Sequence, residues 1–230
     1  DVDAARELGI AVLNTPAAAS DAVAEFTVAL MLQLLRPIPR LCEAYRRGAF
    51  HAARQRTHGC ELRGLTVGIV GMGRIGSRVG RICSAGFGAR VLYNDIASVG
   101  PFDFAATPAD KPSLYSACDV LTLHVPLDAT TRGLIGADAL ARLRRGAYLV
   151  NTARGAVVDT AALCDTLARG ALAGAALDVT DPEPLPVDHP LLADPRCILT
   201  PHVAARTHEG LRRMFAIVDD VVAFLRGSGA

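Results

Sequence analysis

The sequence contains no tryptophan, only 5% aromatic residues and a formal net charge of only +1. A charge so close to zero argues against a surface made to bind nucleic acid. No run of 18 apolar residues occurs, so we expect no segment that spans a membrane. Lysine is nearly absent as well, because Lys111 is the single lysine among 24 basic residues. Since arginine fills the other basic positions, a lone arginine is a weak indicator of function in this chain.

Closely spaced cysteines are also missing. None of the six cysteines lies within four residues of another: Cys42, Cys60, Cys83, Cys118, Cys164 and Cys197. This spacing forms no zinc motif, and we expect no metal site. A chain of 230 residues with 51% hydrophobic residues needs no disulfides to fold, so we expect free thiols in a reducing cytoplasm. The length corresponds to about one and a half domains of roughly 150 residues.

From residue 65 onward, short β-rich runs alternate with stretches of helix length. This alternation indicates a parallel sheet covered by helices on both faces, the doubly wound α/β arrangement of a Rossmann-type domain. Strands are predicted over residues 66–70, 90–93, 120–125, 147–150, 173–177 and 198–200, and helices over 75–85, 113–117, 137–144 and 160–169.

The flanking stretches carry weaker signals. An apolar run over residues 10–13 predicts a further strand. The apolar spacing over residues 20–35 predicts a helix with Ser20 as its N-cap, which could belong to the core or to a subunit interface. Residues 36–63 are rich in arginine and histidine, and indicate either a solvated connection with a short helix or an anion-binding patch. An amphipathic helix is predicted over residues 209–225.

A glycine-rich sequence joins the strand predicted at residues 66–70 to the helix that follows it. Gly71, Gly73 and Gly76 form a GxGxxG pattern. Between a strand and a helix, these glycines permit a tight turn, a close approach of the backbone to a pyrophosphate, and close packing of the helix on the strand. The free N–H groups at the start of the helix favour bound phosphates. The pattern in this context predicts a dinucleotide site.

An acidic residue follows the next predicted strand. Asp95 lies 19 residues after Gly76. A carboxylate at this place accepts hydrogen bonds from the ribose hydroxyls of NAD and repels the extra phosphate of NADP. No arginine or lysine stands in residues 96–100 to offset that repulsion. The sequence therefore predicts NAD as the cofactor, although Asp95 taken alone could be an ordinary turn residue.

Three later strands are each followed by a side chain suited to catalysis, namely Arg154, Glu183 and His202. Because ligands bind at the carboxyl ends of the strands in a doubly wound sheet, the three could converge on one crevice. Histidine can carry the proton that interconverts an alcohol and a ketone, and a carboxylate can orient its ring. Arginine can bind a substrate carboxylate through two parallel hydrogen bonds. Taken singly, each of these three could instead be a surface or loop residue. A further histidine, His124, is expected to pack against the cofactor crevice rather than to catalyse.

Four segments resemble the D-isomer-specific 2-hydroxyacid dehydrogenases, and they occur in that family's order: residues 71–76, 151–159, 178–184 and 200–204. The resemblance covers nearly the whole chain. It implies an NAD-dependent oxidoreductase that transfers a hydride between nicotinamide and a small D-2-hydroxyacid or 2-ketoacid, such as glyoxylate, hydroxypyruvate or a phosphoglycerate-like acid. It also implies homodimers that pair through their cofactor domains.

The resemblance further implies roles for individual residues. Arg154 would bind the substrate carboxylate, His202 would act as the acid and base, and Glu183 would be its partner. Asp178 would hold the carboxamide of the nicotinamide. The residues implied to contact the cofactor are Gly71, Gly73, Arg74, Ile75, Gly76, Asp95, Val125, Thr152, Asp178, His202, Ala204 and Ala205.

The resemblance also divides the chain into three parts. Residues 1–17 correspond to an edge of a flavodoxin-like substrate-binding domain, and residues 18–204 to the NAD-binding domain. Residues 205–230 correspond to a C-terminal helix that returns to the substrate domain, most of which would precede residue 1. The alternative function is therefore an NAD(H)-binding module without turnover, similar to the corepressors that sense redox state with this fold.

Overall fold

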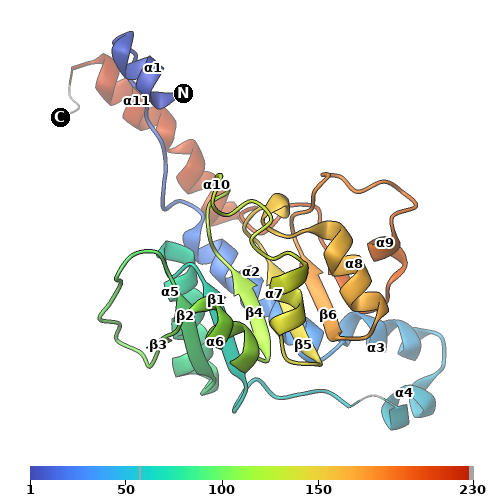
Figure 1. Ribbon diagram of the computed structural model, residues 1–230. Coiled ribbons are helices and arrows are strands. Elements are labelled where there is room, and N and C mark those ends of the chain that lie inside the picture. Colours follow the sequence, from blue (N-terminus) through green and yellow to red (C-terminus); the bar gives the residue numbers. More distant parts are fainter. Residues whose placement is uncertain (57, 228–230) are drawn as a thin grey trace.

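The computed structural model describes residues 1–56 and 58–227, and its centre is a seven-stranded sheet (Figure 1). All of its strand pairs are parallel, in the order β3-β2-β1-β4-β5-β6-β7. The strands are β1 (Thr66–Val70), β2 (Arg90–Asn94), β3 (Thr107–Pro108), β4 (Val120–Leu123), β5 (Ala147–Asn151), β6 (Leu172–Leu177) and β7 (Cys197–Leu199). The order reverses direction between β1 and β4. In such a sheet the ligand crevice lies at this reversal, outside the carboxyl ends of the strands.

The central strands are buried on both faces. Every residue of β1 and of β4 is buried, as expected of Val-, Ile- and Leu-rich strands that lie under helices on either side. In the middle of β1, a Cβ on Gly68 would lie 2.8 Å from the Cβ of Cys118, so the absence of a side chain lets the next layer approach. This close packing sets the thickness of the domain at its centre.

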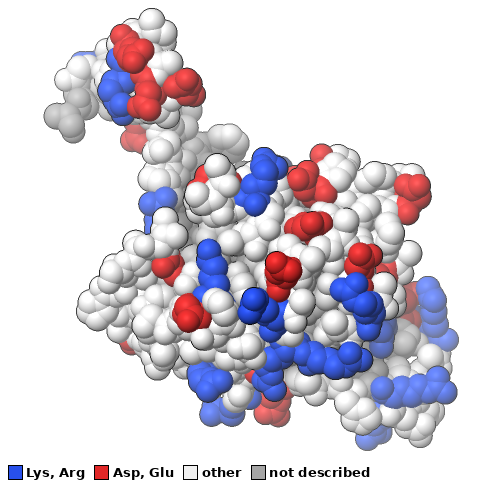
Figure 2. All heavy atoms as spheres, viewed as in Figure 1, with Lys and Arg blue, Asp and Glu red and all other residues white. Residues whose placement is uncertain are grey.

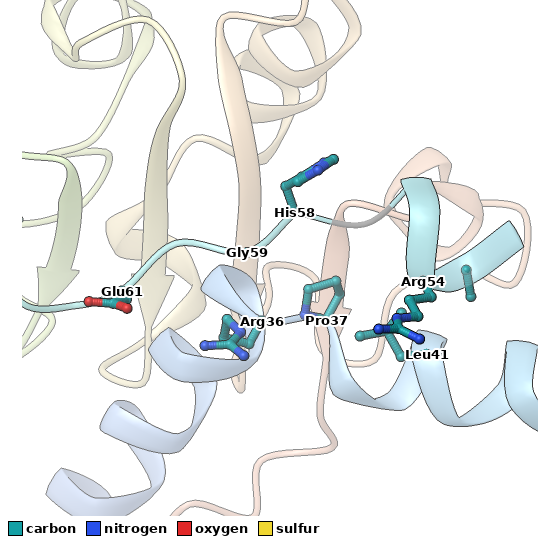
Figure 3. A pocket seen from close by; sticks show the side chains of 8 residues that line it. Arg36, Pro37, Leu41, Arg54, His58, Gly59 and Glu61 are labelled. Atoms are coloured by element: carbon teal, nitrogen blue, oxygen red, sulfur yellow. The ribbon is translucent and has the colours of Figure 1, made fainter. Parts of the chain in front are cut away.

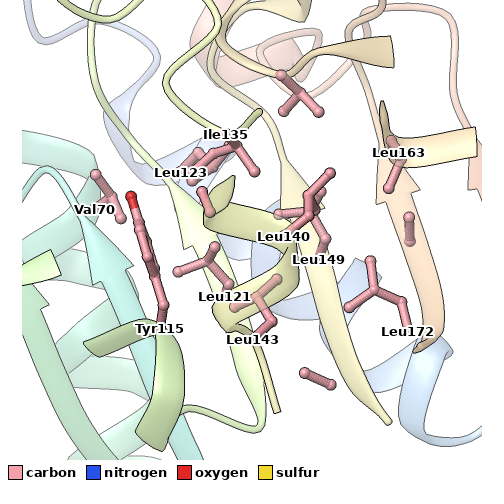
Figure 4. Packing of buried hydrophobic residues seen from close by; sticks show 14 of the residues in the cluster. Val70, Tyr115, Leu121, Leu123, Ile135, Leu140, Leu143, Leu149, Leu163 and Leu172 are labelled. Atoms are coloured by element: carbon pink, nitrogen blue, oxygen red, sulfur yellow. The ribbon is translucent and has the colours of Figure 1, made fainter. Parts of the chain in front are cut away.

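The helices are α1 (Val2–Glu7), α2 (Ser20–Leu35), α3 (Ile38–Arg46), α4 (Phe50–Arg56), α5 (Arg74–Arg81), α6 (Lys111–Ala117), α7 (Ala137–Arg142), α8 (Thr160–Ala168), α9 (Pro190–Ala193), α10 (His208–Phe215) and α11 (Ile217–Leu225), with a π-helical turn η1 (Ile82–Gly86) and a 3-10 turn η2 (Gly155–Val157). Helices α6, α7 and α8 cover one face of the sheet, over a core that includes Leu121 and Leu149 (Figure 4). Helices α2 and α5 cover the other face, over a core that includes Met31 and Ile69. The sheet therefore has a hydrophobic core on each side.

Helix α2 belongs to the core of the domain, since nine of its residues are buried. Of the two alternatives that its sequence left open, core and interface, the structure supports the core.

In the described part of the chain no single helix is long and apolar enough to cross a membrane, and α2 and α3 meet that test only together, as a pair bent by 56°.

The two ends of the described chain project from this body, at the upper left of Figure 1. Neither α1 nor α11 contains a buried residue. Large apolar side chains in and beside these helices are exposed, among them Val2, Leu8, Ile10, Phe215, Val218 and Leu225.

The structure confirms the predicted doubly wound parallel sheet, and all six strands predicted from residue 65 onward are present within two residues of the expected bounds. The short strand β3 was not predicted. The strand predicted over residues 10–13 is wrong: this segment is an exposed loop, and it joins no strand of the described sheet. An apolar run needs a neighbouring strand to pair with before it becomes part of a sheet.

Three helix predictions also need correction. The helix predicted over residues 209–225 divides at Ala216 into α10 and α11. Ser20 is the first residue of α2 rather than its N-cap; Ala19 occupies the cap position and no side chain bonds to the first turn. Residues 36–63 contain two short helices, α3 and α4, where one was predicted.

Candidate active site

The glycine-rich turn follows β1, at the reversal of the strand order. Gly71 has a φ of +91°, and a Cβ there would lie 2.5 Å from the carbonyl oxygen of His124. A Cβ on Gly76 would lie 2.0 Å from the carbonyl oxygen of Gly71. Both positions therefore require glycine. By contrast, no atom lies within 4 Å of a Cβ built on Gly73, which leaves room for a phosphate to reach the backbone.

The start of α5 presents donors to that open space. The helix begins at Arg74 and Ile75, and no side chain bonds to its free N–H groups. Asp95, after β2, accepts a hydrogen bond from the backbone N–H of Met72 at 2.6 Å. This hydrogen bond joins the Asp95 carboxylate to the glycine-rich turn. The carboxylate lies where the ribose of a dinucleotide would lie. The geometry around Gly73, Arg74 and Asp95 fits a dinucleotide.

His202 and Glu183 form a hydrogen-bonded pair at the same edge of the sheet. The Nδ1 atom of His202 lies 2.7 Å from Oε1 of Glu183, and the backbone N–H of Thr180 donates to Oε2 at 3.3 Å. The hydrogen bond from His202 is the main cause that lowers the pKa of the Glu183 carboxyl, against an opposing effect of burial. The hydrogen bond from the Thr180 N–H and the electrostatic effects of His202 and Arg154 lower this pKa further.

A buried carboxylate holds the loop that carries His202. Asp178 is 1% exposed, and its Oδ1 accepts hydrogen bonds from Thr200 Oγ1 at 2.6 Å and from the N–H of Val203 at 2.9 Å. Its Oδ2 accepts the N–H of Ala204 at 2.9 Å. Between these bonds, His202 has a φ of +54°, and it is the one non-glycine residue with positive φ in residues 1–56 and 58–227. Asp178 therefore fixes the backbone conformation at His202 and, with it, the direction of the His202 side chain.

Arg154 follows β5 in a turn that Asn151 stabilises. The fully buried Asn151 accepts the N–H of Ala153 at 3.0 Å and donates to the carbonyl oxygen of Arg154 at 2.9 Å. Thr152, in the same turn, is bonded through its hydroxyl to Thr27 of α2 at 2.8 Å. The guanidinium of Arg154 is exposed, and it makes one hydrogen bond to a described residue, to the carbonyl oxygen of Ala153 at 2.6 Å. Its other N–H groups are available to a ligand.

The turn of Arg154 and the loop of Glu183 are packed against each other. A Cβ on Gly155 would lie 1.9 Å from the carbonyl oxygen of Thr180. Thr160, at the start of α8, donates to the carbonyl oxygen of Asp181 at 2.8 Å. A cavity of about 460 Å³ opens beside Glu183 and His202, with an apolar wall of leucines: Leu185, Leu192 and Leu199. These contacts set the distance between the arginine and the hydrogen-bonded pair.

The remaining predicted residues lie at the same edge. Val125 follows β4, and its Cγ1 would lie 2.9 Å from a Cβ on Gly71. Ala204 is buried, and the carbonyl oxygen of Ala205 accepts the N–H of Thr207 at 3.0 Å. The structure thus brings every predicted site residue to the carboxyl ends of the strands.

The surroundings of His124 suit a packing role. Its Nε2 lies 3.0 Å from Thr122 Oγ1, whereas its Nδ1 is buried and has no partner. Burial lowers the pKa of this imidazole to about 3. A ring that stays neutral near pH 7 is a poor proton donor, in keeping with the packing role expected for His124.

A second hollow lies at the opposite end of the sheet, where α2 ends (Figure 3). It has a volume of about 480 Å³ and is lined by Arg36, Arg54, His58 and Glu61 among others. Basic side chains gather along this lower edge of the molecule in Figure 2. None of the predicted catalytic residues lines this hollow.

Comparisons with known proteins agree with this geometry. The sequence pattern of the family described as "D-isomer specific 2-hydroxyacid dehydrogenase, NAD binding domain" matches residues 28–204. The chain is 42% identical to the glyoxylate reductase of Aeropyrum pernix, over 99% of this chain and 70% of that protein. It is 38% identical to the glyoxylate/hydroxypyruvate reductase B of Pectobacterium carotovorum, over 99% of this chain and 72% of that protein. A crystal structure of D-lactate dehydrogenase from Aquifex aeolicus, complexed with NAD and lactic acid, superimposes with a TM-score of 0.88 and 33% identity, covering 99% of this chain and 73% of that one.

The fold and the site define an oxidoreductase with a doubly wound NAD-binding domain. The chain belongs to the D-isomer specific 2-hydroxyacid dehydrogenase family, whose members are NAD-dependent enzymes. The family, the fold class and NAD as the cofactor, all predicted from the sequence, are confirmed.

Two residues that organise the site were not predicted. Asn151 offered a signal, since an asparagine at a strand end commonly bonds to the backbone two residues on. Thr27 offered none, because a threonine on the buried face of a helix looks like a packing residue. Only the fold shows that it meets Thr152, which is 125 residues away.

Proposed function

We propose that this protein reduces small 2-ketoacids to D-2-hydroxyacids with NADH, and oxidises the products in the reverse direction. The observation that carries the proposal is the 2.7 Å contact between His202 Nδ1 and Glu183 Oε1, beside the positive charge of Arg154. Glyoxylate and hydroxypyruvate are the proposed substrates, and the names of the relatives support this choice.

His202 is the proposed acid and base. Because Glu183 accepts a hydrogen bond from Nδ1, a proton stays at that nitrogen and Nε2 is left to face the substrate. In reduction, the protonated ring donates its Nε2 proton to the ketone oxygen, and the Glu183 carboxylate stabilises the charged ring beforehand. In oxidation, neutral Nε2 accepts the proton of the substrate hydroxyl.

Arg154 is the proposed anchor for the substrate carboxylate. Its planar guanidinium can offer two parallel N–H groups to the two carboxylate oxygens. With the carboxylate held by Arg154 and the carbonyl oxygen by His202, the plane of the ketoacid is fixed and one face of C2 turns toward the cofactor crevice. A fixed face explains how one stereoisomer of the hydroxyacid would be formed.

The crevice residues have proposed roles toward NAD. Gly71, Gly73 and Gly76, with Arg74 and Ile75, would bind the pyrophosphate, and Asp95 the ribose. When bound, NADH supplies the hydride that is added to C2 of the ketoacid. The nicotinamide end would be lined by Val125, Thr152, Asp178, His202, Ala204 and Ala205.

We further propose that residues 18–204 form the NAD-binding domain and that residues 1–17 and 205–230 belong with a substrate-binding domain. Residues 228–230 lie outside the described residues. The proposal is supported by the projecting helices α1 and α11, which bury no residue and expose apolar side chains. A second domain would cover that surface.

A homodimer and a cytoplasmic location are proposed as well. Helices α3 and α4 form an arm without buried residues, and Ile38, Tyr45 and Phe50 on it are 54%, 66% and 44% exposed. The rings of Tyr45 and Phe50 pack edge to face at 5.7 Å. Exposed aromatic and apolar side chains of this kind favour contact with another subunit. The cytoplasmic location is supported by the six free cysteines.

A substrate survey tests the proposed reaction. We expect the intact protein to oxidise NADH in the presence of glyoxylate or hydroxypyruvate, and to use NADH in preference to NADPH because of Asp95. Pyruvate serves as the comparison ketoacid. If the protein bound NADH but none of the three ketoacids led to its oxidation, the proposal would be contradicted and an NAD(H)-binding module would be supported instead.

Arg154→Lys tests the anchor. Lysine keeps the charge but loses the two-pronged geometry, so the KM for glyoxylate should rise at least about tenfold. The Kd for NADH, measured by fluorescence titration, should stay near that of the wild type. A normal KM together with a normal kcat would show that Arg154 does not hold the substrate.

A further inference from the structure

Thr27 makes two hydrogen bonds from one hydroxyl group, deep inside the domain. It lies on α2 and is 0% exposed. Its Oγ1 lies 2.7 Å from the carbonyl oxygen of Val23, one turn earlier in the helix, and 2.8 Å from Oγ1 of Thr152. Thr152 is 7% exposed and lies in the turn between β5 and Arg154. The bond therefore joins the core helix to the turn that carries the substrate-binding arginine.

The direction of each bond follows from proton counting. A carbonyl oxygen can only accept, so the single hydroxyl proton of Thr27 is donated to Val23. The hydrogen in the second bond must then come from Thr152, which donates to Thr27. The proton of Thr152 is thereby held on the α2 side. Its oxygen keeps only lone pairs for any further partner, so it can accept hydrogen bonds but cannot donate one.

Helix α2 supports the His202 side of the site as well. Nε of Arg213, on α10, donates to the carbonyl oxygen of Ala18, just before α2, at 2.7 Å. A Cβ on Gly210, also on α10, would lie 3.8 Å from the Cβ of Ala22. Helix α10 follows directly after the loop of His202, with Thr207 as its N-cap. The beginning of α2 thus contacts α10, the helix after the His202 loop, while Thr27 contacts the turn of Arg154.

We propose that Thr27 is a positioning residue for substrate binding: through Thr152 it fixes the turn that carries Arg154 and keeps the Thr152 oxygen as a hydrogen-bond acceptor. The inference rests on the proposed role of Arg154 toward the substrate carboxylate. Without Thr27, the hydroxyl of Thr152 would turn to find another acceptor. The turn of Arg154 would lose its tie to the core.

Thr27→Val tests the proposal, because valine has nearly the same volume and lacks only the hydroxyl. In the intact protein with NADH bound, we expect the Kd for oxamate, a carboxylate analogue that is not reduced, to rise about fivefold. The KM for glyoxylate should rise in parallel, with a much smaller change in kcat. Thr27→Ser, which restores the hydroxyl, should bring both values back to within about twofold of the wild type.

Two further variants separate positioning from stability. Val28→Ala removes core volume next to Thr27 without touching a hydrogen bond, and it should lower the melting temperature while leaving the Kd for oxamate unchanged. In a double-mutant cycle, adding Thr27→Val to Thr152→Val should cause no further loss of oxamate affinity, since Thr27 acts through Thr152.

Wild-type oxamate affinity in Thr27→Val would overturn the proposal, as would full additivity in the cycle or an equal loss in Val28→Ala. Failure of the proposed function gives a different result. If Arg154→Lys itself bound oxamate normally, the role of Arg154 would be wrong. If Arg154→Lys were impaired and Thr27→Val were normal, the inference about Thr27 alone would fail.

Discussion

His202 takes a backbone conformation that most residues other than glycine avoid. Its φ of +54° costs on the order of 1–3 kcal/mol when the surroundings hold a residue there. The bonds from Val203 and Ala204 to the buried carboxylate of Asp178 offset this cost. The result is a ring whose Nδ1 reaches Glu183. At the scale of single residues, the site is built by buried polar groups that shape the loops from beneath.

His124 makes the free energy of unfolding depend on pH. Burial lowers its pKa from 6.5 to about 3, so between these values the unfolded chain binds more protons than the folded one. The stabilisation is complete above about pH 6.5 and is lost as the pH falls toward 3. His124→Gln keeps an amide that can bond to Thr122 but does not titrate. Between about pH 7 and 5, we expect the variant to lose about 2 kcal/mol less than the wild type.

Urea denaturation at the two pH values measures this difference. The comparison between variant and wild type cancels the contributions of the other titrating groups. Equal losses of unfolding free energy in the two proteins would show that the imidazole of His124 is not kept neutral by burial.

At the scale of elements, contacts between loops position the catalytic groups. The turn after β5 and the loop after β6 meet where Gly155 faces Thr180, with no space for a side chain. The strands bring these loops to one edge of the sheet, and their mutual packing then fixes Arg154 relative to Glu183 and His202. Catalysis should therefore be sensitive to a single added carbon at this contact.

Gly155→Ala tests that sensitivity. The new Cβ would lie 1.9 Å from the carbonyl oxygen of Thr180, and the two loops must move apart. We expect kcat/KM for glyoxylate to fall at least about tenfold, with the Kd for NADH within about twofold of the wild type. Gly86→Ala is the matched control, because no atom lies within 4 Å of a Cβ built there. Equal kinetics in the Gly155 variant and the wild type would mean that loop packing does not set the geometry.

The sequence predicts the sheet and the edge where the site lies, for clear reasons. Strands that are buried on both faces are continuous apolar runs, and the glycine-rich sequence of residues 71–76 follows the end of the first of them. The bonds of Asp178 to the His202 loop could not be predicted, because they join segments that only the fold brings together. The same holds for the contact between Thr27 and Thr152. The error over residues 10–13 arose because an apolar run does not reveal whether a partner strand is present.

At the scale of the whole molecule, two surfaces extend away from the compact body. One is formed by α1 and α11, and the other by the arm of α3 and α4 (Figure 1). Neither contains a buried residue, and both expose apolar side chains. We propose that the first contacts the substrate-binding domain and the second a partner subunit. The assignments have separate tests.

Phe50→Asp tests the second assignment. A charge on the arm should disfavour burial against a second subunit, so the dimer expected for the wild type should dissociate into monomers. Light scattering after size-exclusion chromatography measures the mass. Val187→Asp, at a 98% exposed site outside α3 and α4, is the control that should remain dimeric. A variant with the mass of the wild-type dimer would exclude the arm as the interface.

The central claim is that His202, held by Glu183, transfers the proton in the reaction with the ketoacid. The most direct measurement is the kcat of His202→Ala with glyoxylate in the intact protein, set beside its Kd for NADH. Proton transfer by His202 predicts a fall in kcat of about 10²-fold or more, as for the loss of a general acid, with NADH affinity changed by less than about threefold. A kcat equal to that of the wild type would contradict it.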